Sequence, residues 1–166
     1  MMDPALRYAG RGWQLSPVHW PRDGVCSCGR PDCGSPAKHP LTTNGLRDAT
    51  TNSEQIREWW QRWPDANIGV VTGLASGIVV VDVDAGHGGL EAWAELQDIY
   101  GRIDTLTSLT GGGGIHLWFQ APADELKSTA GTIAPGIDTR AEGGYVVAPP
   151  SLHISGQRYA WEAEGP

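Results

Sequence analysis

The chain has 166 residues, 40% of them hydrophobic, with a mean hydropathy of -0.30. This length allows one domain with a real core and is short for two. No apolar run reaches 18 residues and residues 1–13 lack the apolar centre of a secretory signal. We therefore expect a cytoplasmic location without membrane contact. The chain stops at WEAEGP without a closing element, so we also expect it to be part of a longer protein.

The net charge of -7 does not favour a protein that binds nucleic acid over its whole surface, since such proteins usually carry a basic footprint. The charge is unevenly distributed. Residues 1–63 hold 8 basic and 6 acidic side chains, a net of +2, whereas residues 64–166 hold 4 and 13, a net of -9. The acidic part is either a solvated surface or a region whose charge bound cations offset.

Hydrophobic periodicity predicts a mixed α+β fold, in which helices carry apolar residues every three or four positions and strands are β-branched runs. In chain order we expect a short helix and a strand within 3–16, an irregular segment 21–45, a helix 53–63, strands 68–71 and 78–83, a helix 88–100, strands 105–110, 115–120, 137–140 and 145–148, and a last strand near 158–161. The irregular segment is long enough to need its own source of order.

The two longer helices each have a predicted buried face. That of helix 53–63 consists of Ile56, Trp59, Trp60 and Trp63. That of helix 88–100 consists of Leu90, Trp93, Leu96 and either Ile99 or Tyr100. The tryptophans of the first helix lie on one apolar face, so we interpret them as core residues, with stacking on nucleic-acid bases as the alternative.

Two carboxylates end the apolar run IVVVDVD. Asp82 and Asp84 are two residues apart, so on a strand both side chains point to the same face. Two carboxylates this close repel each other unless a cation lies between them, and oxygen ligands suit Mg²⁺ or Mn²⁺. Asp138 in GIDTR is the candidate third ligand. The alternative is a set of solvated aspartates in turns.

A glycine-rich segment follows, LTGGGGIHLWF at residues 109–119. Its glycines, Gly111, Gly112, Gly113 and Gly114, free the backbone to bring N–H groups close to an anion. His116 comes next and can donate to a phosphate oxygen, and the Arg140 guanidinium matches a phosphate in shape. The alternatives are a hairpin turn, a core histidine, and an ion pair between Arg140 and an aspartate. No Gly-Lys-Ser/Thr follows the glycines, so this is not a Walker A loop.

A cysteine cluster lies in the irregular segment. Its pattern, Cys26-x-Cys28-x4-Cys33-x5-His39, matches a structural Zn²⁺ site with three thiolates and one imidazole. Metal binding would explain how this stretch becomes ordered. His19 is an alternative fourth ligand, and free thiols are the alternative to a metal site. Lys38, beside the last ligand, either faces phosphate or template or is simply exposed.

Taken together, these segments resemble the N-terminal bifunctional primase/polymerase domain of plasmid, phage and actinobacterial replication proteins, in the archaeo-eukaryotic primase superfamily. The resemblance runs in order through ALRYAGRGWQLSPV, CSCGRPDCGSPAKHP, SEQIREWW, WPDANIGVVTG, SGIVVVDVD, GGGGIHLWF, GIDTRAEGGYVVAPPS and SGQRYAW. It implies a single domain, residues 1–166, in which an RNA-recognition-motif-like antiparallel sheet (65–166) packs beside an N-terminal α/β module (1–64) that carries the zinc segment 26–39.

The resemblance also implies a role for each residue. Asp82, Asp84 and Asp138 would hold two Mg²⁺ or Mn²⁺ ions; His116, Arg140, Lys38 and the glycines would contact the nucleotide; and Ser151 would be structural. The implied partners are template DNA, a primer and nucleoside triphosphates. Priming in this family often needs a C-terminal helical domain, and sometimes a helicase, neither of which is in this chain. We therefore expect nucleotide addition and leave de novo priming open.

Two other functions fit the same residues. A metal-dependent phosphohydrolase or nuclease would use the same carboxylates but would lengthen no strand. A non-catalytic, zinc-stabilised module that binds a replication origin or a nucleotide would need no carboxylates for its activity. Three candidate metal carboxylates argue against the second alternative.

Overall fold

The computed structural model describes residues 1–162, which form the expected α+β fold with antiparallel sheets. The elements are α1 (Met2–Gly10), β1 (Leu15–Val18), β2 (Pro21–Arg22), β3 (Val25–Cys26), η1 (Gly45–Asp48), α2 (Ser53–Arg62), β4 (Asn67–Val71), β5 (Ile78–Val83), η2 (Ala85–His87), α3 (Gly89–Tyr100), β6 (Leu106–Leu109), β7 (Ile115–Gln120), β8 (Thr129–Ala134), β9 (Ile137–Arg140), β10 (Tyr145–Ala148) and β11 (Ala160–Trp161). No helix in this part of the chain is long and apolar enough to cross a membrane.

The larger sheet has six strands in the order β11-β6-β7-β5-β9-β8. Its central strand, β5, pairs antiparallel with β7 on one side and β9 on the other. Because side chains alternate along a strand, Val81 and Val83 face one side of the sheet and Val80 and Asp82 face the other. The apolar run of β5 is therefore covered on both faces before it ends in carboxylates.

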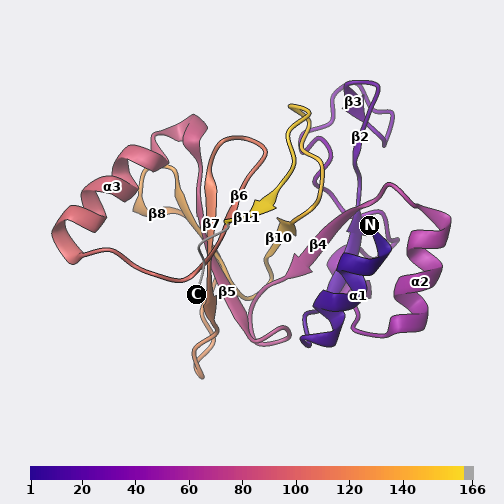
Figure 1. The fold of residues 1–166 in the computed structure, drawn as a ribbon, viewed down its shortest axis with the longest axis horizontal. Helices are drawn as coiled ribbons and strands as arrows, with labels where there is room; N and C mark the ends of the chain where they lie inside the picture. The colour runs from indigo at the N-terminus through magenta and orange to yellow at the C-terminus, as the bar shows by residue number, and fades with distance from the viewer. Residues whose placement is uncertain (163–166) are drawn as a thin grey trace.

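Helix α3 covers the first of these faces (Figure 1). Val83, Leu117 and Ile137 are buried there, against Trp93 and Leu96 of the helix. The prediction for this helix is wrong at its ends. Leu90, Ile99 and Tyr100 are exposed, because the stripe of α3 that packs against the buried cluster of the sheet is narrow and consists of Ala92, Trp93 and Leu96.

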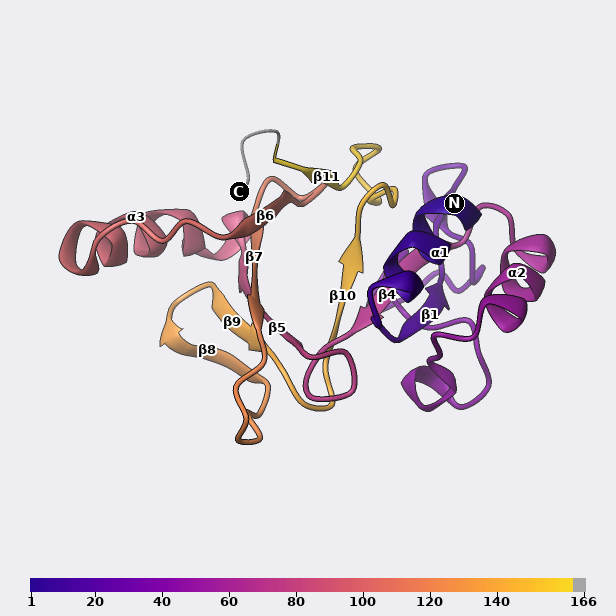
Figure 2. The same cartoon turned by 60° about the horizontal axis from the view of Figure 1, so that its bottom comes forward.

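The smaller sheet has the order β1-β4-β10 and packs against α1 and α2 (Figure 2). The Asn52 side chain caps α2 by accepting from two backbone N–H groups of its first turn. Ile56 and Trp60 are buried in the core, and Trp59 and Trp63 pack half-buried against it, which confirms the predicted face. Two strands of this sheet, β4 and β10, come from beyond residue 64. The smaller sheet is therefore not formed by residues 1–64 alone.

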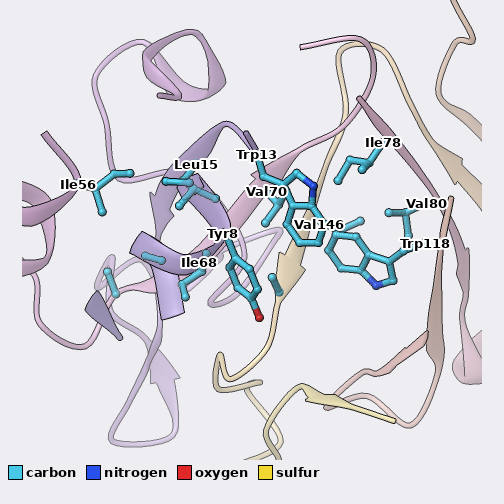
Figure 3. Close-up of a cluster of buried hydrophobic side chains, with 14 of the residues drawn as sticks. Tyr8, Trp13, Leu15, Ile56, Ile68, Val70, Ile78, Val80, Trp118 and Val146 are labelled. Carbon is cyan, nitrogen blue, oxygen red and sulfur yellow. The ribbon is translucent and has the colours of Figure 1, made fainter. Parts of the chain in front are cut away.

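An aromatic cluster joins the two sheets (Figure 3). Trp13, which precedes β1, stacks on Trp118 of β7 with ring centroids 5.1 Å apart and an interplanar angle of 12°. Trp161 packs 5.1 Å from Trp118, and Tyr8 stacks on Trp13. Offset aromatic contacts of this kind bury large apolar areas in a defined geometry. They hold the smaller sheet at one position relative to the six-stranded sheet.

Two parts of the fold differ from the sequence-based expectation. The segment 21–45 is mostly turns, as predicted, but it contains the short hairpin of β2 and β3. Strand β8 was not predicted, because its residues TAGTIA lie at an exposed sheet edge and show no apolar alternation.

Ser151 is fully buried, and its Oγ accepts from Ile68 N at 2.9 Å, which confirms its structural interpretation.

Candidate active site and metal cluster

Three polar side chains form a row across the second face of the six-stranded sheet. Asp82 of β5 lies opposite His116 of β7 and opposite Asp138 of β9. Directly opposed residues of antiparallel strands place their side chains on the same face, so backbone pairing alone brings these groups together. His116 Nε2 lies 3.4 Å from Asp82 Oδ1. His116 is buried, and its Nδ1 has no hydrogen-bond partner within residues 1–162.

Arg140 bridges the two carboxylates of this row. Its Nη2 lies 3.1 Å from Asp82 Oδ2 and 2.9 Å from Asp138 Oδ2. The other Asp138 oxygen, Oδ1, accepts from Gly131 N at 2.8 Å. Arg140 thus makes the ion pair that the sequence allowed as an alternative to phosphate binding. Its positive charge lies between two candidate ligands of a cation.

Asp84 is positioned by a turn and not by the strand, which ends at Val83. It caps the short helix η2, with Oδ1 accepting from Gly86 N at 2.8 Å and Oδ2 lying 2.8 Å from His87 Nδ1. Its side chain is about half exposed, compared with 23% for Asp82. The two aspartates therefore share a site but are held by different means.

The local charges favour ionised carboxylates. Burial raises the pKa of Asp82, but the hydrogen bond and charge of His116 and the charge of Arg140 outweigh burial and leave that pKa below its usual value. The pKa of Asp84 is also lowered. Burial again raises it, the contacts with His87 and Gly86 lower it more, and the nearby Asp82 charge opposes them. Both side chains are thus carboxylates at neutral pH, as metal ligands must be.

The glycine-rich segment forms the hairpin turn between β6 and β7. A Cβ on Gly114 would lie 2.2 Å from Val83 O, and one on Gly111 would lie 2.2 Å from His153 Cβ. Gly113 has a φ of +90°, in the region that favours glycine. Gly112 differs, because a Cβ there would meet nothing closer than 3.7 Å. Gly111 and Gly114 are therefore required by close packing and Gly113 by its φ, whereas a Cβ on Gly112 would make only ordinary van der Waals contacts.

These groups line one cavity of about 290 Å³. The lining consists of Ser35, Lys38, Asp82, Val83, Asp84, Thr110, Gly112, His116, Arg140, Tyr145, Val146, Val147 and Tyr159. Most of the predicted site residues are therefore together, but Gly111, Gly113 and Gly114 do not line the cavity, and Asp138 reaches it only through its row and through Arg140. Sequence reasoning missed Ser35, Tyr145 and Tyr159. Both tyrosines lie in the segments that carry the resemblance, but their spacing showed no chemistry.

The predicted cysteine cluster is also assembled. Ligand atoms of Cys26, Cys28, Cys33 and His39 all lie within 4.8 Å of one another. The geometry favours His39 over His19 as the fourth ligand, since a ring nitrogen of His39 belongs to this group and none of His19 does. The Cys/His cluster is the only group of three or more such side chains that meets this distance within residues 1–162, so the three aspartates are more widely spaced.

The pKa values of two thiols in the Cys/His cluster are shifted by neighbouring groups. A backbone hydrogen bond at Arg30 lowers the pKa of Cys28 to about 6, whereas burial and the neighbouring sulfurs of Cys28 and Cys26 raise the pKa of Cys33. Three thiolates this close need a cation to coexist at neutral pH. Three sulfurs and one imidazole are a donor set suited to Zn²⁺. The cluster is thus compatible with zinc binding.

Comparison with known families adds to this geometry. The family model for the bifunctional DNA primase/polymerase, N-terminal, matches residues 5–166, nearly the whole chain. The chain belongs to this family. No curated protein matches the sequence. Membership makes this primase/polymerase domain part of a family of nucleotidyltransferases that act on DNA and nucleotide substrates.

Proposed function

We propose that this primase/polymerase domain is a template-dependent nucleotidyltransferase that adds nucleotides to a 3′-OH during DNA replication. The observation that carries the proposal is the single cavity that contains Asp82, Asp84, His116 and Arg140. Such a site brings together carboxylates for divalent metals and donors for phosphate oxygens, which phosphoryl transfer requires. Family membership supports the same reaction.

The carboxylates offer the hard oxygen ligands that Mg²⁺ or Mn²⁺ prefers. Asp82 and Asp84 line the cavity and repel each other, while Arg140 neutralises Asp82 and Asp138. We propose that Asp82, Asp84 and Asp138 hold two such ions, with Arg140 turning from the carboxylates toward the nucleotide phosphates. Two bound metals would lower the pKa of the attacking hydroxyl and stabilise the pyrophosphate leaving group.

The other cavity residues would act on the triphosphate. His116 Nε2 points toward Asp82 and is positioned to donate to a phosphate oxygen near the metals. Gly112 lines the cavity without a side chain, which would let a phosphate approach its backbone closely. Arg140 and Lys38 add positive charge to the same cavity. His116, Arg140 and this backbone would stabilise charge on the phosphates in the transition state, whereas Lys38 would bind the triphosphate equally in the ground state and the transition state.

We propose that the Cys/His cluster holds one Zn²⁺ with a structural role. The segment that carries it has only the short β2–β3 hairpin as regular structure, so metal ligation would supply the order that backbone pairing does not. Template DNA and a primer would bind near the cavity, and the net positive charge of residues 1–63 is suited to their phosphates. A helicase or a C-terminal helical domain remains a further proposed partner.

Primer extension tests this function. Wild-type protein with a primed template, nucleoside triphosphates and Mg²⁺ or Mn²⁺ should lengthen the primer. The double variant Asp82→Ala plus Asp84→Ala should fold and add no nucleotide. Extension by that variant at the wild-type rate would overturn the proposal. Release of mononucleotides or free phosphate without a longer strand would instead indicate the hydrolase.

The same assay without a primer, run with ribo- and deoxyribonucleotides in turn, asks whether this domain begins a strand by itself. Products that appear only with a primer would limit the function of this chain to nucleotide addition.

A further inference from the structure

The cavity wall contains two residues from the cysteine segment. Ser35 and Lys38 line the same cavity as Asp82 and Asp84, although they belong to the turns that follow β3. Lys38 is exposed and brings a long cationic side chain to this wall. The Cys/His cluster is therefore adjacent to the cavity and not confined to a remote part of the surface.

The turn Ser35–Lys38 lies between two residues of the Cys/His cluster, Cys33 and His39. Lys38 N donates to Ser35 O at 3.2 Å and closes the turn. Ala37, inside it, is buried and has a φ of +60°, a conformation that a residue with a Cβ keeps only where its surroundings hold it. Its N–H donates to Cys26 Sγ at 3.2 Å. The backbone of the turn is thus tied directly to a sulfur of the cluster.

The other side of the turn is held by the smaller sheet. Tyr145 of β10 lines the cavity and donates from Oη to Lys38 O at 2.7 Å. The fully buried Asn67 of β4 donates from Nδ2 to Ala37 O at 3.1 Å. Lys38 therefore has its backbone fixed between a metal-ligand set and a tyrosine hydroxyl, while its side chain is free to reach a ligand.

We propose that the Cys/His cluster and Tyr145 together position Lys38 over the nucleotide cavity, so that metal loading of the cluster sets the affinity for the nucleoside triphosphate. Tyr145 acts in this as a positioning residue. Fixing the backbone of a flexible cationic residue lowers the conformational entropy that binding must remove. The proposal rests on the proposed function, because it assumes that the cavity binds a triphosphate.

A double-mutant cycle tests the role of Tyr145. Lys38→Ala should raise the KM for nucleotide about 10-fold, and Tyr145→Phe, which removes only the hydroxyl, about 3-fold, both with nearly unchanged kcat. In the Lys38→Ala background, Tyr145→Phe should add nothing, since it acts through Lys38. Additive effects would show that Tyr145 contacts the nucleotide directly and would overturn the proposal.

A matched control is Tyr8→Phe. It also removes a tyrosine hydroxyl that donates to a backbone carbonyl, here Pro149 O at 2.8 Å. It should lower the melting temperature without changing the KM. An equal rise in KM for this variant would mean that loss of stability alone weakens nucleotide binding, and the positioning role would be rejected.

Metal removal is tested by nucleotide binding without primer, so that the result does not depend on catalysis. Calorimetry with a non-hydrolysable nucleoside triphosphate in Mg²⁺ should show weaker binding once zinc is stripped, with metal content measured alongside. Binding by Lys38→Ala should lose nothing more on stripping. Equal affinity before and after stripping would overturn the proposal. A wild type that binds nucleotide but extends no primer would contradict the proposed function alone.

Discussion

The carboxylate row and the Cys/His cluster are both groups of ionisable side chains, but the chain builds them in opposite ways. Asp82, His116 and Asp138 stand on paired strands, and the ladder of backbone hydrogen bonds brings them together. Cys26, Cys28 and Cys33 come from a segment with little regular pairing. The first group is positioned before any ion binds, whereas the second should depend on its ion for position.

Because of this difference, we expect substitutions in the first group to affect activity and substitutions in the second group to affect local stability. In a sheet, removal of a carboxylate leaves the strand pairing intact, so the chemistry can be lost while the fold remains. In the cysteine segment, where we propose a zinc ion, removal of a ligand should also loosen the local structure. The four predictions below test this contrast, starting with the largest expected effect.

Asp82→Asn should reduce the rate of nucleotide addition by about 10³-fold or more, because several kcal/mol of metal and charge stabilisation are lost in the transition state. The melting temperature should stay within a few degrees of that of the wild type, since the amide keeps the shape of the side chain. Thermal unfolding and primer extension on the same preparation measure both effects. Unfolding of this variant would show that the side chains of this row also stabilise the fold.

Cys26→Ser should remove about one equivalent of bound zinc and loosen residues 19–40, because the chosen sulfur both belongs to the cluster and accepts from Ala37 N. Hydrogen exchange should increase in that segment while β5, β7 and β9 stay protected. A zinc-free wild-type protein that is stable and fully ordered would contradict the contrast between the two groups.

Gly114→Ala and Gly112→Ala form a matched pair within one turn. The first places a methyl group against Val83 O and should cost about 1–3 kcal/mol of unfolding free energy, as overpacking usually does. The second meets nothing closer than 3.7 Å and should leave stability nearly unchanged, but it should weaken nucleotide binding because its methyl group would occupy cavity space that a phosphate needs. Chemical denaturation and nucleotide titration distinguish the two effects. Equal destabilisation would contradict this division.

Asn52→Ala removes the cap of α2 and should cost about 1 kcal/mol, with no change in KM or zinc content. It is the reference for a small loss of stability in the half of the chain that carries the Cys/His cluster. A rise in KM from this variant would mean that the effects expected of Cys26→Ser come from general destabilisation.

The parts of this molecule that follow a local rule could be predicted from sequence. The run before Asp82 predicted a buried strand, and the spacing of Ile56 and Trp60 predicted a helix, because both depend on near neighbours. The exposed ends of α3 were mispredicted, since apolar spacing does not say how much of a helix its sheet will cover.

The candidate site also combines features that follow from local sequence with features that depend on distant parts of the chain. The register of β5, β7 and β9 explains why Asp82, His116 and Asp138 meet, but the sequence alone did not show which strands pair. Ser35 and Tyr145 were missed because their place in the cavity depends on how a loop folds against a distant strand. Such contacts leave no periodic signal.

The Trp13–Trp118 stack has an optical consequence. Two indoles held 5.1 Å apart and nearly parallel are expected to couple their electronic transitions, which gives a circular-dichroism signal that separate tryptophans do not produce. One ring belongs to the segment that leads into the smaller sheet and the other to the six-stranded sheet, so the signal reports on the junction between them. A change in the near-ultraviolet circular-dichroism spectrum would therefore report a change in the packing of this junction.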